Sequence, residues 1–183
     1  PCHAPDRQRW FSMSVTPLGS TRQGVVIAHI DITPRIQAEE QLRKLSMAVE
    51  QSPESIVITD LLARIAYVNG AFLRQTGYSQ KELIGQNPRL LQSGKTPRET
   101  YAALWATLLA GNTWKGELYN RRKDGSDYVE FAIITPIRQP DGEVTHYVAV
   151  KEDVTERKRM GTELDSYRDH LEQLVADRTV ELE

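Results

Sequence analysis

The chain has 183 residues, of which 39% are hydrophobic and 26% are charged, and its formal net charge is −2. This composition is that of an ordinary globular protein and excludes a disordered or collagen-like chain. The small net charge gives no electrostatic reason to expect nucleic acid or an anionic membrane surface as a partner. No apolar run reaches the roughly 18 residues of a transmembrane helix, so we expect no direct membrane insertion.

Cys2 is the single cysteine, which excludes an internal disulfide and a cysteine-based zinc site. We therefore expect a cytoplasmic location. The chain opens with a proline in a polar stretch and closes within a helical pattern. It is interpreted as part of a longer protein, which could be attached to a membrane elsewhere.

A short pattern occurs twice along the chain. Asp-hydrophobic-Thr-x-Arg stands at residues 31–35 and again at 153–157, each time after a strand-like run and before a helical one. Upstream of each copy, residues 10–18 resemble residues 129–137. We interpret residues 1–34 as the C-terminal remnant of a preceding domain of the same kind as the complete one that follows.

That complete domain, residues 52–155, is predicted to be α+β. Strands are predicted at 55–60, 64–69, 114–122, 127–137 and 143–154, and a longer helix at 97–110. This order indicates a five-stranded antiparallel sheet with helices on one face. In the longer helix, Thr96 is the predicted N-cap and Gly111 the stop signal.

Amphipathic helices flank the domain: a connecting helix at 35–51 and a signalling or coiled-coil helix at 156–183 that leads toward an output domain. Their apolar positions include Leu42, Leu45 and Val49 in the first helix and Leu164, Leu171 and Leu174 in the second. Isolated helices of this length are marginal in water. We therefore predict a parallel homodimer through these stripes, because twofold dimers are the commonest oligomers.

The sequence contains none of the catalytic motifs that we sought. Phosphate-binding loops, dinucleotide fingerprints, zinc-protease helices and nucleophile elbows are missing, and the four histidines are scattered. We expect no catalytic residues, no metal ligands and no enzyme activity in this segment.

Polar residues point to a possible pocket. Asn120 shares the apolar face of its strand with Trp114 and Leu118, and a buried carboxamide needs backbone, water or ligand partners. Trp105 and Trp114 are candidates for the pocket walls. The loop before the long helix carries three further candidates, Asn87, Arg89 and Gln92.

Several motifs occur in the order typical of PAS domains. They are Ser55-Ile-Val-Ile-Thr-Asp60, Thr76-Gly77-Tyr78, Trp114-x-Gly116-Glu117, Asn120-Arg-Arg-Lys-Asp-Gly125 and Asp153-Val-Thr-Glu-Arg157. Residues 44–158 therefore resemble a PAS domain with its PAC segment, which implies the PAS fold and a role as sensor and signal transmitter. Residues 170–183 resemble the linker before a histidine-kinase dimerisation domain. That similarity implies a sensor histidine kinase as the parent protein.

Two flavin-binding branches of the family resemble the chain. The LOV photosensors match at Asn87, Arg89, Gln92 and Asn120, but they carry a cysteine at the position of Pro88, so cysteinyl photochemistry is excluded. They also carry amides at the positions of Glu130 and Lys151. FAD-binding redox sensors of nitrogen-fixation regulation resemble it more closely, through Ser93-Gly-x-Thr-Pro97 and Tyr101-x-Ala-Leu-Trp105. This resemblance implies FAD, with Asn120 bonded to the ring edge and Trp105 walling the ring.

Two alternatives stay open. In the first, the module binds no ligand and serves dimerisation and transmission, with a Glu130–Lys151 pair filling the cleft. In the second, the PAS module belongs to a cyclic-di-GMP-signalling protein.

Overall fold

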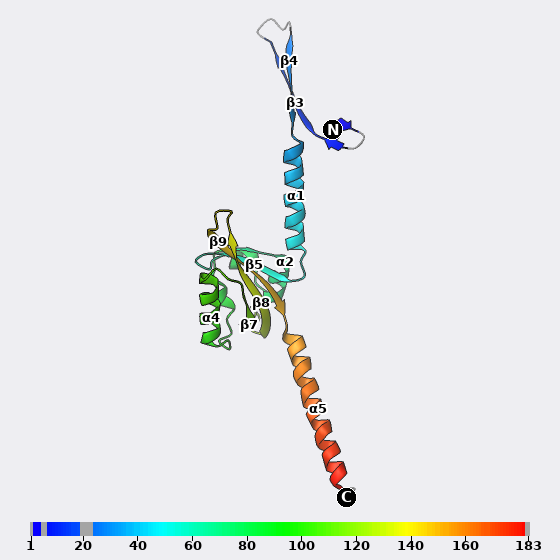
Figure 1. Ribbon diagram of the computed structural model, residues 1–183, viewed down its shortest axis with the longest axis vertical. Coiled ribbons are helices and arrows are strands. Elements are labelled where there is room, and N and C mark those ends of the chain that lie inside the picture. The colour runs from blue at the N-terminus through cyan, green and yellow to red at the C-terminus, as the bar shows by residue number, and fades with distance from the viewer. Residues whose placement is uncertain (1, 5–6, 19–23, 182–183) are drawn as a thin grey trace. The chain divides into compact units, whose positions relative to one another are not determined.

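The structure is a computed structural model that describes residues 2–4, 7–18 and 24–181 (Figure 1). The chain divides into two compact units, Pro1–Val49 and Glu50–Glu183. The predicted domain remnant, 1–34, and the predicted signalling helix, 156–183, each include a few positions that lie outside the described residues. Among the described helices, none combines the length and the apolar character needed to cross a membrane.

The first unit contains two hairpins and most of a helix. Strands β1 (Cys2–Ala4) and β2 (Arg7–Arg9) pair with each other, as do β3 (Phe11–Pro17) and β4 (Val25–Asp31), and α1 (Thr33–Glu50) follows. All side chains of β3 and β4 are exposed. A two-stranded ribbon of this kind is marginal by itself in water.

The second unit is built around a five-stranded antiparallel sheet, which confirms the predicted fold. Its strands are β5 (Ser55–Asp60), β6 (Ile65–Val68), β7 (Trp114–Arg121), β8 (Asp127–Arg138) and β9 (Val144–Asp153), in the spatial order β6-β5-β9-β8-β7. Between β6 and β7 come α2 (Gly70–Thr76), α3 (Gln80–Leu83), a 3₁₀ helix η1 (Pro88–Leu91) and α4 (Arg98–Leu109). The helix α5 (Thr155–Glu181) follows the sheet.

The core lies between one face of the sheet and the helices that link β6 to β7. Residues alternate between buried and half-exposed along β5, as expected for a sheet covered on one side. Phe72 and Leu83 pack against Val57 in one buried cluster, and Leu104 packs near Leu118 in a second. The space between these two clusters holds the candidate site.

The repeated sequence pattern forms the same hydrogen-bonded clasp twice. In the first unit, the Thr33 hydroxyl oxygen accepts from the backbone N–H of Trp10 at 2.8 Å, and Asp31 accepts from the backbone N–H of Thr33 at 2.9 Å. In the second unit the equivalent bonds involve Val129, Asp153 and Thr155, at 2.9 and 2.9 Å. Both hairpins therefore end in the same connection to a helix. That residues 1–34 are the remnant of a preceding domain stays a prediction.

One predicted helix cap is wrong. The N-cap of α4 is Pro97 and not Thr96. The Thr96 hydroxyl instead accepts from the backbone N–H of Tyr119 at 2.7 Å and donates to its carbonyl at 3.3 Å. Thr96 thus pins the loop before α4 to β7, a tertiary role that local sequence does not reveal. Gly111, with φ of 76°, stands just past the helix end as predicted.

Candidate functional site

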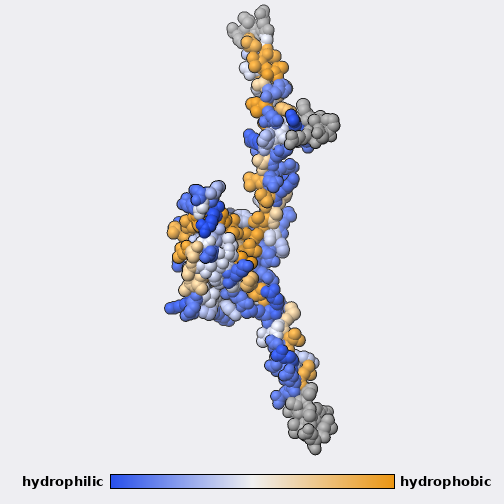
Figure 2. Space-filling view, in the orientation of Figure 1, coloured by the Kyte–Doolittle hydropathy of each residue, from blue (hydrophilic) through white to orange (hydrophobic). Residues whose placement is uncertain are grey.

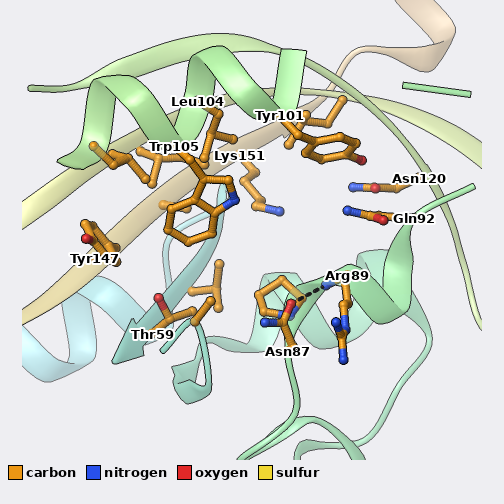
Figure 3. A pocket seen from close by; sticks show the side chains of 17 residues that line it. Thr59, Asn87, Arg89, Gln92, Tyr101, Leu104, Trp105, Asn120, Tyr147 and Lys151 are labelled. Atoms are coloured by element: carbon orange, nitrogen blue, oxygen red, sulfur yellow. Dashed lines mark hydrogen bonds between the residues drawn. The ribbon is translucent and has the colours of Figure 1, made fainter. Parts of the chain in front are cut away.

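A cavity of about 430 Å³ lies between the inner face of the sheet, η1 and α4 (Figure 3). Its apolar wall includes Val57, Leu104, Leu108, Leu118, Ile134 and Ala149. Polar side chains enter from β5, β7, β9 and the loop that carries η1. An apolar cavity with a few convergent polar groups is the usual form of a small-molecule site.

Two amides meet at one end of the cavity. Asn120, on the inner face of β7, is only 4% exposed, and it forms an isolated β-bridge with Gln92 at the end of η1. Ser93 reinforces this junction because its hydroxyl donates to the carbonyl of Tyr119 at 2.7 Å. The loop is thereby held on the edge of the sheet, and both amides turn into the cavity (Figure 3).

Asn87 and Arg89 also line the cavity, but they differ from the two amides in their local roles. The side chain of Asn87 accepts from the backbone N–H of Arg89 at 3.0 Å and so caps the start of η1. Arg89 is exposed to solvent. Asn87 therefore shapes the loop, while Arg89 places an exposed positive charge at the cavity.

Aromatic side chains border the cavity. The rings of Trp105 and Tyr147 meet edge to face, with centroids 6.1 Å apart, and Tyr101 lies one helical turn before Trp105 in the wall. Trp105 is 38% exposed, so it borders both the cavity and solvent. A flat ring within the cavity would cover Trp105 and remove this exposed apolar surface from water.

Lys151 and Glu130 form a buried ion pair, with Lys151 Nζ 2.5 Å from Glu130 Oε1. Lys151 lines the cavity, and its ammonium points toward the two amides in Figure 3. Glu130 supports it from the neighbouring strand β8. Because 430 Å³ remain next to the pair, the ion pair closes one end of the cleft without filling it.

Of the eight residues expected from the sequence, the cavity brings together Asn87, Arg89, Gln92, Trp105, Asn120 and Lys151. Glu130 lies behind Lys151. Trp114 belongs to the buried core with Leu104 and Leu118 and does not line the cavity. Its indole occupies the space above Gly116, where a Cβ atom would stand 2.5 Å from Trp114 Cζ2. Because Gly116 has no side chain, the Trp114 indole can lie over β7, the strand to which both residues belong.

Sequence reasoning missed Tyr128, which does not line the cavity but neighbours Asn120. This residue pairs with Asn120 across β7 and β8, it is 1% exposed, and its hydroxyl is buried with no hydrogen-bond partner among the described residues. Burial, followed by the nearby Glu130 carboxylate, raises the pKa of Tyr128. Its position two residues before Glu130 on the same strand face was the signal that would have found it.

The described residues hold no group of three or more metal-ligating side chains. The cavity offers amide donors and acceptors, an ion pair at Lys151 and apolar walls. Such a site is suited to holding a flat organic molecule with acceptor atoms along one edge.

Comparisons with known proteins cover the part of the chain that contains the cavity. A family profile described as a PAS domain matches residues 53–156. The chain is 50% identical over 107 residues to a nitrogen fixation regulatory protein of Klebsiella oxytoca, an alignment that covers 58% of this chain and 22% of that protein. The chain therefore spans about a fifth of the length of the first curated relatives it matches.

Two solved structures extend the comparison. An RNA-binding light-oxygen-voltage receptor matches with a TM-score of 0.65 and 26% identity, covering 92% of this chain and 45% of that one. A light-oxygen-voltage domain studied with a flavin analogue matches with a TM-score of 0.58 and 28% identity, covering 69% of this chain and 96% of that one.

Proposed function

Since the chain belongs to the PAS domain family, we propose that residues 52–155 bind FAD in the cavity and that α5 passes the state of this ligand to an output domain. The chain is a sensory module of the type found in signalling proteins. The proposed parent is a cytoplasmic sensor histidine kinase, in which this segment performs no reaction of its own.

The cavity carries this proposal. Its volume of about 430 Å³ falls within the roughly 300–1,000 Å³ typical of small-molecule sites. Asn120, Gln92 and Lys151 present amide and ammonium groups at one end (Figure 3). The edge of a flavin ring carries carbonyl and ring-nitrogen acceptors, which match such donors, while its flat body matches the apolar wall.

The relatives support the same ligand. One similar structure is a light-oxygen-voltage domain studied with a flavin analogue. The 50% identity to a nitrogen fixation regulatory protein is in line with the resemblance to the redox sensors of nitrogen-fixation regulation. Pro88 stands where the LOV photosensors carry their cysteine, so the proposed signal is redox state and not cysteinyl photochemistry.

The residues of the chain have distinct parts in this proposal. A bound flavin would supply reversible electron transfer. Asn120 and Gln92 orient the polar edge, and Trp105 with Tyr147 limits the access of water. Lys151 lies two residues before Asp153, whose carboxylate accepts from the first backbone N–H of α5. A change in hydrogen bonding at Lys151 therefore reaches the start of α5 and shifts the balance between two arrangements of that helix.

The test is a flavin-binding measurement on the purified chain. We expect a yellow protein, or a colourless one that takes up FAD and gains flavin absorbance. Ala149→Leu, which fills the cavity, should abolish uptake. Leu109→Ala is the matched control, because Leu109 is exposed on α4 and does not line the cavity. A chain that is folded and never binds FAD, FMN or riboflavin contradicts the proposal.

One observation favours a second candidate, a ligand-free module for dimerisation and transmission. The Lys151–Glu130 pair already satisfies its two charges within the domain, so the fold does not need a ligand to neutralise them. In this case Ala149→Leu should raise stability and change no spectrum. A PAS module of a cyclic-di-GMP-signalling protein would differ from the proposed kinase in its output domain.

The proposed assembly is a parallel homodimer through α1 and α5. Both helices carry apolar side chains that a single chain leaves exposed, visible as orange patches along them in Figure 2. The exposed members of the stripes are Leu42 and Leu45 in α1 and Leu164, Leu171 and Leu174 in α5. Val49, which completes the proposed stripe of α1, is half-buried. Light scattering should give a dimer mass, and Leu45→Glu with Leu171→Glu should shift it to a monomer. An unchanged dimer would contradict the helical interface.

A further inference from the structure

Tyr128 on β8 carries a buried hydroxyl group that has no hydrogen-bond partner among the described residues, and the residue as a whole is 1% exposed. A buried donor without an acceptor is costly to a fold, whereas a phenylalanine would fill the same space without that cost. Burial raises the pKa of Tyr128, so the hydroxyl keeps its proton and remains a donor. We therefore expect a neighbouring side chain to serve as its acceptor.

The ring of Tyr128 is held in place by Arg122. The guanidinium carbon of Arg122 lies 4.5 Å from the centroid of the ring, within the range of cation–π attraction. Arg122 is itself anchored, because its Nε donates to the carbonyl of Gln75 at 2.9 Å and its Nη2 pairs with Asp153. The ring therefore keeps its place beside the sheet, and the hydroxyl keeps its place with it.

Asn120 stands directly opposite Tyr128 in the register of β7 and β8. Directly opposite residues have Cβ atoms about 4.5–5.5 Å apart, so their side chains contact each other. The Asn120 side chain is close enough to act on the pKa of Tyr128, but the two groups do not meet in hydrogen-bond geometry. A small rotation of the Asn120 amide brings its oxygen to the hydroxyl.

Glu130 is the competing acceptor, two residues along the same face of β8. Its carboxylate already pairs with Lys151, with Nζ 2.5 Å from Oε1. The Asn120 amide instead opens into the cavity, and Figure 3 shows its nitrogen turned toward the cavity interior. With the nitrogen directed there, the amide oxygen of Asn120 is the atom available to Tyr128.

We propose that Tyr128 is a positioning residue for the ligand site: its hydroxyl donates to the side-chain oxygen of Asn120 and fixes the Asn120 NH₂ group as a donor that faces the cavity. An asparagine amide without such a partner can present either its oxygen or its nitrogen. With Tyr128 in place, the polar end of the cavity selects a planar ligand whose edge carries acceptor atoms over one whose edge carries donors. The inference rests on the proposed FAD site and names the group that sets its hydrogen-bonding preference.

The first test needs no ligand. Tyr128→Phe should stay folded, because phenylalanine fills the same space. In the ¹⁵N-labelled, ligand-free chain, the Asn120 NH₂ group should become more mobile in this variant, and its NMR relaxation should change. Resonances that disappear in Asn120→Ala assign the group. A merely structural hydroxyl would not alter the motion of this one amide.

The second test uses FAD. Tyr128→Phe should weaken its binding about threefold to tenfold, the range expected for one neutral hydrogen bond. In an Asn120→Ala background the same substitution should have no further effect, because Tyr128 acts through Asn120. Tyr119→Phe is the matched control. Tyr119 precedes Asn120 on β7, and its ring lies against Lys158 and outside the cavity, so this variant should bind FAD as tightly as wild type.

The outcomes separate the role of Tyr128 from the choice of ligand. Equal losses of affinity from Tyr128→Phe with and without Asn120 would assign the hydroxyl to Glu130 and overturn the proposal. A wild-type chain that binds no flavin overturns the FAD assignment, and the relaxation of the Asn120 NH₂ group then still decides whether Tyr128 holds this amide. Unchanged relaxation in Tyr128→Phe overturns the positioning role in either case.

Discussion

Lys151 and Glu130 face each other across neighbouring strands inside the domain, with Nζ 2.5 Å from Oε1 and the two residues 5% and 1% exposed. Removing two charges from water is costly, and a close pair offsets much of that cost only while both partners are present. Lys151 also lines the cavity, whereas Glu130 does not. The pair therefore joins the candidate site to the packed interior of the sheet.

Lys151→Met should destabilise the domain by about 3–5 kcal/mol, because it leaves the Glu130 carboxylate buried without its cation. The double variant Lys151→Met with Glu130→Leu should recover most of this loss, since two apolar side chains then fill the same space. Urea unfolding of the four proteins measures the coupling. If the single and double variants lose the same free energy of unfolding, packing and not charge stabilises this part of the sheet.

Gly116→Ala should destabilise the domain by about 1–3 kcal/mol. An added Cβ would stand 2.5 Å from Cζ2 of Trp114, so the indole must leave its place in the core. Gly161→Ala is the matched control, because nothing lies within 4 Å of a Cβ at that helical position; it should not destabilise the protein. Thermal unfolding distinguishes the two, and an equally tolerated Gly116→Ala would show that Trp114 can repack freely.

Thr155→Val should loosen the junction between β9 and α5. The Thr155 hydroxyl accepts from the backbone N–H of Val129 at 2.9 Å and donates to Asp153 at 2.6 Å, and losing these bonds should cost about 1–3 kcal/mol. Thr33→Val makes the same change in the first unit and should leave the unfolding of the second unit unaltered. Hydrogen exchange at the amides of Val129 and Thr155 reports the junction directly. Unchanged protection there would contradict a fastening role.

The stability of the domain should depend on the ionisation of Glu82. Hydrogen bonds from Lys123 and from Ser79 lower the pKa of Glu82 to about 2 from its ordinary 4.5. The ionised form is favoured in the folded state, so its contribution is present above pH 4.5 and is lost as the pH falls from 4.5 to about 2.

In Lys123→Met, carboxyl NMR titration should show the pKa of Glu82 moving up toward 4.5. The stability difference between wild type and this variant should shrink over the same acid range. Lys81→Met is the matched control. It removes an equal charge from α3, the short helix that carries Glu82, and should leave the titration of Glu82 nearly unchanged. A pKa of Glu82 already near 4.5 in the wild type would refute the proposed contact.

The sheet was predictable because its signals are local. Period-two alternation marks the strands, and the Asp124-Gly125 turn marks the hairpin between β7 and β8. The repeated clasp was also accessible, because two copies of one pattern imply one geometry. The alternation of side chains along the strand predicted that Asn120 lies on the inner face of the sheet. The family resemblance predicted that Lys151 and Glu130 lie at the cleft.

What sequence reasoning missed depends on contacts between distant segments. Thr96 has the side chain of a helix cap, yet it bonds to Tyr119 on another strand. Trp114 was expected in the pocket wall because an indole is suited both to a pocket wall and to a packed core. The structure places it in the core, where it fills the space that the absent side chain of Gly116 leaves free.

Asn120→Ala should weaken FAD binding at least about tenfold, the value of one hydrogen bond of about 1.4 kcal/mol, and should leave the folded cavity intact. Asn87→Ala is the informative comparison, because the Asn87 side chain is already engaged with the backbone N–H of Arg89. We expect that variant to lose stability at η1 more than affinity. Fluorescence titration with FAD, paired with urea unfolding, separates the two effects. A different result is that Asn120→Ala binds FAD as tightly as wild type while Trp105→Ala binds it more weakly. The apolar wall of the cavity would then hold the flavin ring, and the assignment of Asn120 to the polar edge of the ring would be wrong.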